Sequence, residues 1–306
     1  MKALPKRPIL SLDKAIDDFV IHLEAEHKSP KTIRTYCAAF GQLRDHLMAE
    51  GRPTDVRQIE PADVKRFLIE LVKSRSAATA NTRYWALRAF FGWLVDEREL
   101  EISPLNRLKP PQYENRATDV LTDEQIDHLF KACAGTSFND RRDKAMLSVL
   151  VDTGCRVGEL VGMTTERLHV REGVARIMGK GGYERDLFLG PKTREDMSRY
   201  LRARDTHKHS HSTAVWLGLH GPVTASGVGQ ILKTRAASAG IDPNDVHAHV
   251  FRHTFAHSWK LAGGTEDNLM TLGGWRSPVV MQRYGRSAAG ARAREAHAKL
   301  SPRDRF

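Results

Sequence analysis

The sequence predicts a mainly α-helical protein with a small antiparallel β-sheet, in which a helical N-terminal domain precedes an α+β domain. Three observations support this fold class. Apolar residues recur at helical spacing through the N-terminal third and again beyond residue 190. Residues 106–119 are polar and proline-containing and interrupt that spacing, as a linker would. Short, turn-bounded runs of β-branched and aromatic residues occur within residues 167–190.

The first domain, residues 1–105, is expected to be a small helical bundle. Its clearest start signal is Ser29 followed by Pro30, because serine caps a helix and proline suits its first position. The connections between the helices are short, which favours a bundle. The expected helices cover about residues 12–26, 30–51, 61–71 and 78–98.

The second domain, residues 120–306, begins with a capping box in which Thr122 and Gln125 each satisfy a backbone N–H of the other. A helix at about residues 140–153 should follow. The expected strands are RLHV, GVARIMG and ERDLFLG, and the turn between the last two is rich in glycine. Beyond residue 190 the pattern is helical again, with a final helix near residues 288–299.

The composition indicates a folded cytoplasmic protein. With 41% hydrophobic and 28% charged residues, the chain is neither disordered nor membrane-like. No apolar run approaches the roughly 20 residues of a membrane span, and acidic residues follow the N-terminus where a signal peptide would be apolar. The three cysteines, Cys37, Cys133 and Cys155, form neither a disulfide framework nor a metal-binding pair.

The net charge of +11 and the pI near 9.7 indicate a polyanionic partner. Lysine and arginine side chains displace counterions from phosphates, which drives binding to nucleic acid. The alternative is an ordinary basic protein. Because the excess charge is spread over both halves of the chain, both domains could contact DNA.

Two segments each place a basic residue in a setting that suits phosphate. In TGCRVGEL, Arg156 opens a short helix, where backbone N–H groups and a guanidinium favour a phosphate oxygen. The alternative is a surface ion pair between Arg156 and Glu159. In MGKGGYERDL, Lys180 lies at a glycine-rich hairpin tip; the alternative is a solvated turn residue. The chain contains no Walker loop.

The segment HAHVFRHTFAHSW places His249 and Arg252 on one helix face, three residues apart. That face would combine a titratable group with a fixed cation. His253 and His257 are also spaced as a metal pair, but the segment lacks the HExxH glutamate and a third ligand. We therefore expect one of these two histidines to pack within the helix interface.

The segment LGGWRSPVVMQRYGR contains Trp275 after a glycine pair and Tyr284 between two arginines. An isolated tyrosine at such a position is ordinarily a core aromatic with its hydroxyl at the surface. The flanking arginines favour a chemical role instead.

Together these four segments resemble the tyrosine recombinase family, also called the phage integrase family. TGCRVGEL matches its first arginine block, HVFRHTFA its histidine–arginine block and LGGWRSPVVMQRY its tyrosine block, in the family's order. The resemblance is strong over about residues 120–290. It implies a tyrosine recombinase catalytic domain preceded by a helical core-binding (SAM-like) domain, which the N-terminal region matches only in type and length.

The resemblance implies a role for each matched residue. Arg156 and Arg252 would clamp the scissile phosphate, and Tyr284 would be the nucleophile. Lys180 would protonate the 5′ leaving oxygen, and His249 would assist proton transfer.

Three further positions follow from the same match. Trp275 falls where many members of the family have a second histidine; it can donate an indole N–H and pack, but it cannot titrate. Glu159 is expected to orient Arg156, and His253 matches a position that is commonly structural.

The chemistry explains these residue types. Two guanidiniums offset the charge on the non-bridging oxygens of a phosphodiester, and a lysine acid neutralises the leaving oxygen. A tyrosine, whose ordinary pKa is about 10, needs cationic surroundings to lose its proton. The 3′-phosphotyrosine conserves the bond energy, so no cofactor, neither metal nor ATP, is expected.

The resemblance also implies partners. The enzyme would act as a homotetramer on paired sites in double-stranded DNA with short inverted core sequences, near the nucleoid and not at a membrane, with a possible accessory directionality protein. Residues 287–306 would dock on a neighbouring protomer; the alternative is a basic solvated helix.

Three other readings stay open. One is a type IB topoisomerase, which the family resembles in its active site, although the short N-terminal domain favours a recombinase. Another is a catalytically idle DNA-binding regulator on the same scaffold, and the third is a nucleic-acid-binding helical protein whose match is accidental. The retention of all five chemical residues argues against an idle regulator.

The helices at about residues 30–50 and 78–98 are the elements most expected to face DNA. Their candidate contacts are basic: Lys31, Arg34, Arg83 and Arg88. The alternative for each is an ordinary solvated side chain.

Overall fold

The structure is a computed structural model that describes residues 9–113, 119–179, 182–275, 277 and 289–305. The chain divides into two compact units, Met1–Asn115 and Arg116–Phe306. The predicted linker, residues 106–119, spans this division. Each unit is considered by itself below.

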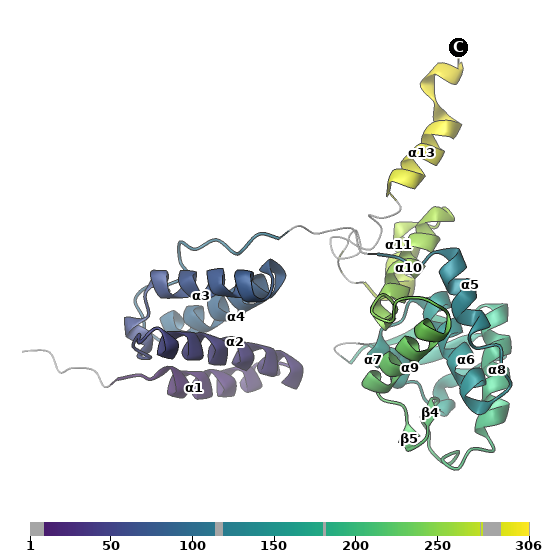
Figure 1. The fold of residues 1–306 in the computed structure, drawn as a ribbon, viewed down its shortest axis with the longest axis horizontal. Coiled ribbons are helices and arrows are strands. Elements are labelled where there is room, and N and C mark those ends of the chain that lie inside the picture. Colours follow the sequence, from purple (N-terminus) through teal and green to yellow (C-terminus); the bar gives the residue numbers. More distant parts are fainter. Residues whose placement is uncertain (1–8, 114–118, 180–181, 276, 278–288, 306) are drawn as a thin grey trace, which may run out of the picture. The chain divides into compact units, whose positions relative to one another are not determined.

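The first unit is a four-helix bundle, as the sequence predicted (Figure 1). α1 and α3 lie on opposite sides of it, with α2 and α4 between them. Ser29 caps α2 by accepting a hydrogen bond from the backbone N–H of Thr32, and Pro30 occupies the first turn. The helices are α1 (Leu12–Ala25), α2 (Pro30–Ala49), α3 (Pro61–Ser74) and α4 (Ala77–Asp96), with a 3₁₀ turn at Val56–Gln58.

Aromatic side chains from three helices form the centre of this bundle. Phe40 and Phe90 are fully buried, with ring centroids 4.7 Å apart, and Phe19 packs edge-on against both. The chain after α4 returns to the bundle, because the hydroxyl of Tyr84 donates a 2.6 Å hydrogen bond to the carbonyl of Leu108. The beginning of the predicted linker is therefore packed on the first unit.

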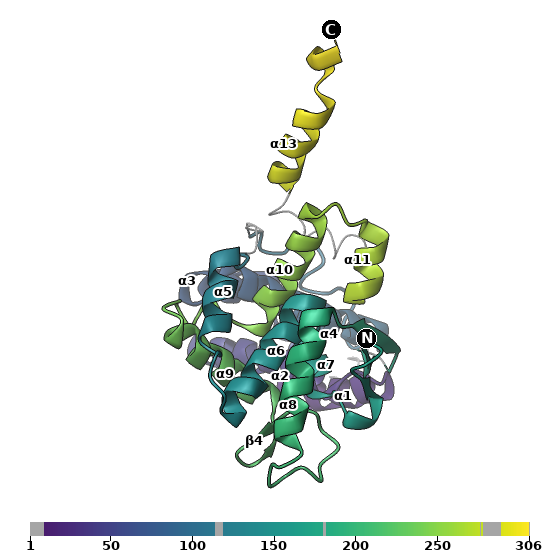
Figure 2. The same cartoon turned by 90° about the vertical axis from the view of Figure 1, so that its right-hand side faces the viewer.

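The second unit is built around α6, which is buried along most of its length. α8 and α10 pack against it (Figure 2). The capping box of Thr122 and Gln125 at the start of α5 is confirmed. Its helices are α5 (Asp123–Lys131), α6 (Phe138–Thr153), α7 (Val157–Val161), α8 (Pro191–Arg204), α9 (Ala225–Ser238), α10 (Ala248–Leu261), α11 (Glu266–Gly273) and α13 (Ala289–Leu300), with 3₁₀ turns at Thr165–Arg167 and Pro302–Arg305.

A three-stranded antiparallel sheet, in the order β1-β2-β3, flanks these helices as predicted. β2 and β3 form a hairpin in which Met178 pairs with Glu184 and Val174 with Phe188. The strands are β1 (Leu168–His169), β2 (Val174–Met178) and β3 (Glu184–Phe188). A second ribbon, β4 (Leu217–Gly218) with β5 (Gly221–Pro222), was not predicted, since two residues a strand leave no alternating pattern. Among the described helices, none is long and apolar enough to cross a membrane.

Candidate active site

Arg156 stands at the junction of two helices. Gly154 ends α6 in the left-handed conformation (φ 55°), and Arg156 then caps α7. A side chain at Gly154 would collide with the ring of Phe255, 2.6 Å from its Cβ. This glycine therefore allows the sharp turn that places Arg156 at the surface, where its side chain is 40% exposed.

Glu159 holds Arg156 from beneath. One carboxylate oxygen accepts the backbone N–H of Arg156 and the other accepts its Nη1, both at 2.8 Å. The Glu159 side chain is only 3% exposed, so this is not the surface pair considered as an alternative. Burial alone would raise the pKa of Glu159, but hydrogen bonds from Arg185 and from Arg156 lower it below its usual value.

Arg252 lies within α10 and is 1% exposed. Its Nη1 donates to the carbonyl of Gly154 at 2.9 Å and its Nη2 to that of Gly273 at 2.7 Å. Arg156 donates from Nη2 to the next carbonyl, that of Gly274, at 3.2 Å. Two successive carbonyls at the end of α11 thus hold one guanidinium each. We call Arg156 and Arg252 the arginine clamp.

Trp275 covers the buried arginine. Its ring centroid lies 3.8 Å from Cζ of Arg252, a cation–π contact, and the residue is 5% exposed. The ring packs so closely on Gly273 that a Cβ there would overlap it. Gly274 has φ 63° and ends α11, which directs the chain into this position. The glycine pair is required by this packing.

His249 and His253 occupy successive turns of α10, with ring centroids 4.6 Å apart. His249 is exposed, whereas His253 is 5% exposed. Although the residue is exposed, partial desolvation of the ring, followed by the positive charge of Arg252, lowers the pKa of His249, which favours the neutral imidazole. The prediction that His253 or His257 packs within the interface is confirmed by His253. The described residues contain no group of three or more metal-ligating side chains.

Burial of His253 predicts a pH-dependent stability. Desolvation lowers its pKa to about 4, from 6.5. The unfolded chain therefore binds more protons between these values, and stability present above pH 6.5 is lost as the pH falls toward 4, by up to about 3 kcal/mol. Urea unfolding of wild type and His253→Gln from pH 7.5 to 4.5 measures this. We expect a shallower pH dependence in the variant; parallel curves would contradict it.

Two predicted site residues, Lys180 and Tyr284, lie outside the described residues. The frame of the hairpin around Lys180 is described. The N–H of Gly179 donates to the carbonyl of Tyr183 at 2.7 Å, and a Cβ at Gly179 would lie 3.9 Å from Oε1 of Glu159. Gly179, which begins this turn, is therefore adjacent to the Glu159 carboxylate that binds Arg156.

Sequence reasoning missed Arg185 on β3. Its Nη2 donates to Glu159 at 2.8 Å and its Nη1 donates to the carbonyl of Leu272. A signal was available: Arg185 and Leu187 are two apart in a strand, so they share the face on which Leu187 is buried. An arginine on a buried strand face requires buried partners.

The four predicted DNA contacts in the first unit differ in their surroundings. Lys31 and Arg34 are exposed. Arg83 connects two helices, donating from Nε to Oε1 of Gln42 at 2.8 Å and from Nη1 to the carbonyl of Thr35 at 3.2 Å. Arg88 donates to the hydroxyl of Tyr84 at 3.1 Å.

These contacts predict different effects of mutation. Arg83→Gln should lower the free energy of unfolding by about 1–2 kcal/mol, because it removes two hydrogen bonds between α2 and α4. Arg34→Gln, the matched control on α2, should change it by less than about 0.5 kcal/mol. Urea unfolding measures both free energies. Equal stability of the two variants would show that the hydrogen bonds from Arg83 to α2 do not stabilise the bundle.

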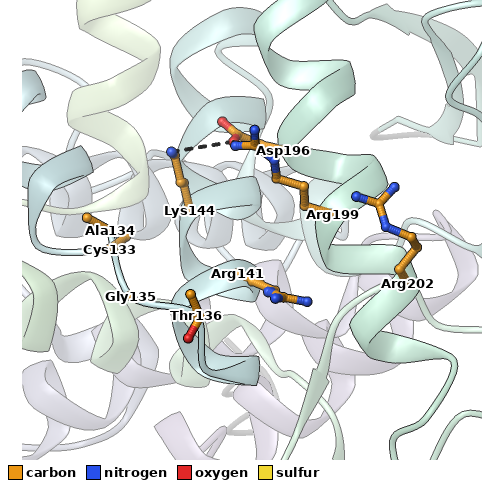
Figure 3. A pocket seen from close by; sticks show the side chains of 9 residues that line it. All are labelled: Cys133, Ala134, Gly135, Thr136, Arg141, Lys144, Asp196, Arg199 and Arg202. Carbon is orange, nitrogen blue, oxygen red and sulfur yellow. Dashed lines mark ion pairs between the residues drawn. The ribbon is translucent and has the colours of Figure 1, made fainter.

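A basic pocket of about 370 Å³ lies elsewhere in the second unit, between the α5–α6 connection and α8 (Figure 3). Nζ of Lys144 lies 3.6 Å from Asp196, the one carboxylate among the lining residues. Neither residue of the arginine clamp lines this pocket, so the pocket is separate from the candidate active site. The lining residues are Cys133, Ala134, Gly135, Thr136, Arg141, Lys144, Asp196, Arg199 and Arg202.

Comparison with known families agrees with this architecture. Residues 119–290 match the model of the phage integrase family, and residues 16–98 match the phage integrase N-terminal SAM-like domain. The chain belongs to the phage integrase family. The curated relatives that it matches are tyrosine recombinases.

Two relatives show the extent of the similarity. Tyrosine recombinase XerD of Shewanella oneidensis is 29% identical over 296 residues, which cover 95% of this chain and 97% of the relative. Tyrosine recombinase XerD of Chlorobaculum tepidum is 31% identical over 261 residues, covering 83% and 84%.

Solved structures share the fold. A XerH site-specific recombinase bound to a palindromic difH substrate, in a post-cleavage complex, matches with a TM-score of 0.75 at 16% identity, covering 94% of this chain and 84% of that one. A λ integrase tetramer bound to a Holliday junction matches with a TM-score of 0.70 at 15% identity, covering 88% and 78%.

Proposed function

We propose that this protein is a site-specific recombinase that cleaves and rejoins DNA through a 3′-phosphotyrosine on Tyr284 and a Holliday junction. The observation that carries the proposal is the arginine clamp, since Arg156 and Arg252 converge on successive carbonyls at the end of α11. A guanidinium fork matches the oxygens of a phosphodiester, and two forks offset the charge of the transition state.

In the cleavage step, the phenolate oxygen of Tyr284 attacks the phosphorus and the bond to the 5′ oxygen breaks. Lys180 gives its proton to that oxygen, and the neutral imidazole of His249 accepts the phenolic proton. In the rejoining step, the 5′-hydroxyl of another strand gives its proton to Lys180 and attacks the phosphotyrosine, and the tyrosine leaves and takes back its proton from His249. Trp275 packs against Arg252 and does not transfer a proton. Neither metal nor ATP enters this balance.

The named relatives and the family's structures support the partners that we propose. These are double-stranded DNA with inverted core sites and a homotetramer on paired sites, since members of the fold are described on a palindromic substrate and as a tetramer on a Holliday junction. We further propose a location at the nucleoid, an accessory directionality protein, and domain limits of residues 1–105 and 120–306.

Covalent trapping tests the function. The protein is mixed, without metal or ATP, with nicked duplex fragments of its own genome, and complexes that survive denaturant are digested and analysed by mass spectrometry. A nucleotide attached to the peptide that contains Tyr284 supports the proposal. Specific retention of DNA without any adduct favours the idle regulator. If the adducts, before denaturation, rejoin only the strand that was cut and never a second strand, a topoisomerase is favoured.

A further inference from the structure

Arg185 joins three parts of the second unit that are distant in sequence. It lies on β3, it donates to Glu159 of α7 at 2.8 Å, and it donates to the carbonyl of Leu272 in α11. Its side chain is 15% exposed. A Cβ at Gly274 would lie 2.9 Å from Nε of Arg185, so the guanidinium packs directly on the glycine whose carbonyl holds Arg156.

Glu159 is shared between two arginines. Oε1 accepts Nη1 of Arg156, and Oε2 accepts both the backbone N–H of Arg156 and Nη2 of Arg185. A buried carboxylate remains ionised only when such donors surround it. Arg185 therefore fixes the charge and the orientation of Glu159, and Glu159 fixes Arg156.

A guanidinium suits these contacts because its donors are held in a rigid fork. Nη1 and Nη2 of Arg185 serve acceptors on two different helices, whereas lysine has a single nitrogen on a flexible stem. β3 pairs with β2, and a Cβ at Gly179, directly after β2, would lie 3.9 Å from Oε1 of Glu159. Arg185 thus ties the hairpin and the arginine clamp to one carboxylate.

We propose that Arg185 is a positioning residue for strand cleavage: it acts through Glu159 to hold the arginine clamp in register with the β2–β3 hairpin. This role rests on the proposed function. It concerns the rate of the chemical step and not the affinity for DNA, because the Arg185 side chain is only 15% exposed and both of its Nη atoms donate to protein groups.

Cleavage kinetics on a trapped genomic fragment provide the first test. Arg185→Gln should lower the rate constant of adduct formation about 100-fold, with DNA affinity within about threefold of wild type. Arg185→Lys should recover part of that loss, since it keeps a cation near Glu159. The control is Arg176→Gln on β2 of the same hairpin, which removes an exposed pair with Asp186 at 3.0 Å and should leave the rate unchanged.

A double-mutant cycle separates positioning from general stabilisation. If Arg185 acts through Glu159, Arg185→Gln should slow cleavage by less than about threefold in a Glu159→Gln background. Full additivity of the two losses would overturn the proposal. So would a rate for Arg185→Gln equal to that of Arg176→Gln.

Hydrogen exchange tests the coupling without any catalysis. In Arg185→Gln, amide exchange should accelerate at least about tenfold in residues 153–162 and in the hairpin, residues 174–188. If Arg185→Gln folds poorly, Arg185→Lys replaces it, and a smaller acceleration of the same residues is expected. Arg176→Gln should not accelerate residues 153–162. Unchanged exchange refutes the coupling even if the wild type forms adducts, and accelerated exchange without wild-type adducts shows that the proposed function has failed and not the coupling.

Discussion

Tyr284→Phe is expected to abolish every denaturant-resistant protein–DNA complex while leaving DNA retention within about twofold of wild type. Removal of one hydroxyl oxygen takes away the atom that would bond to phosphorus, and no other group on the ring can replace it. The measurement is the yield of covalent adduct on nicked fragments, beside native gel retention of the same fragments.

Tyr113→Phe is the matched control, because Tyr113 is an exposed tyrosine of the first unit. It should form adducts at the wild-type rate. Persistent adducts in Tyr284→Phe would assign the nucleophile to another residue, and loss of DNA retention in the same variant would show that the change had damaged the fold.

Arg252→Gln should lower the rate of adduct formation by a factor of about 10³ and also destabilise the second unit. The kinetic loss follows from removing a preorganised cation from the phosphate, where one donor is worth about 10²–10³. The loss of stability, about 3 kcal/mol, follows because the carbonyls of Gly154 and Gly273 lose a buried donor and Trp275 loses its cation.

Arg235→Gln separates these two effects. Arg235 also lies inside the second unit, where Nη2 is 2.7 Å from Asp143 and 2.9 Å from Asp140, but it does not belong to the clamp. Its loss should lower the urea midpoint while the rate for each folded molecule stays at the wild-type value. If Arg252→Gln behaves in the same way, Arg252 is structural and the proposed clamp is wrong.

The fold was predictable where its signals are local. The proline after Ser29 and the capping box of Thr122 and Gln125 specify helix starts within a few residues, and the structure confirms both. The β4–β5 ribbon was not predictable, because it depends on tertiary contacts and not on an alternating pattern. The tether made by Arg83 was missed for a similar reason: its acceptors on α2 lie more than 40 positions away in the sequence.

The candidate site was predictable only in its side chains. The motifs indicate Arg156 and Arg252, and the structure brings both to the end of α11. No motif indicates that main-chain carbonyls of a glycine pair would hold them, because a carbonyl is present at every residue. The roles of Lys180 and Tyr284 stay predictions.

The carbonyls at the end of α11 have a consequence for DNA binding. A carbonyl orients a guanidinium without carrying a net charge, whereas the buried Glu159 carboxylate does carry one and pairs with Arg156. The two guanidiniums are therefore already oriented before the phosphate binds, and little reorganisation energy is needed. We therefore expect these two side chains to lose little conformational entropy when the scissile phosphate binds, and calorimetry of DNA binding should detect only a small entropic cost from them.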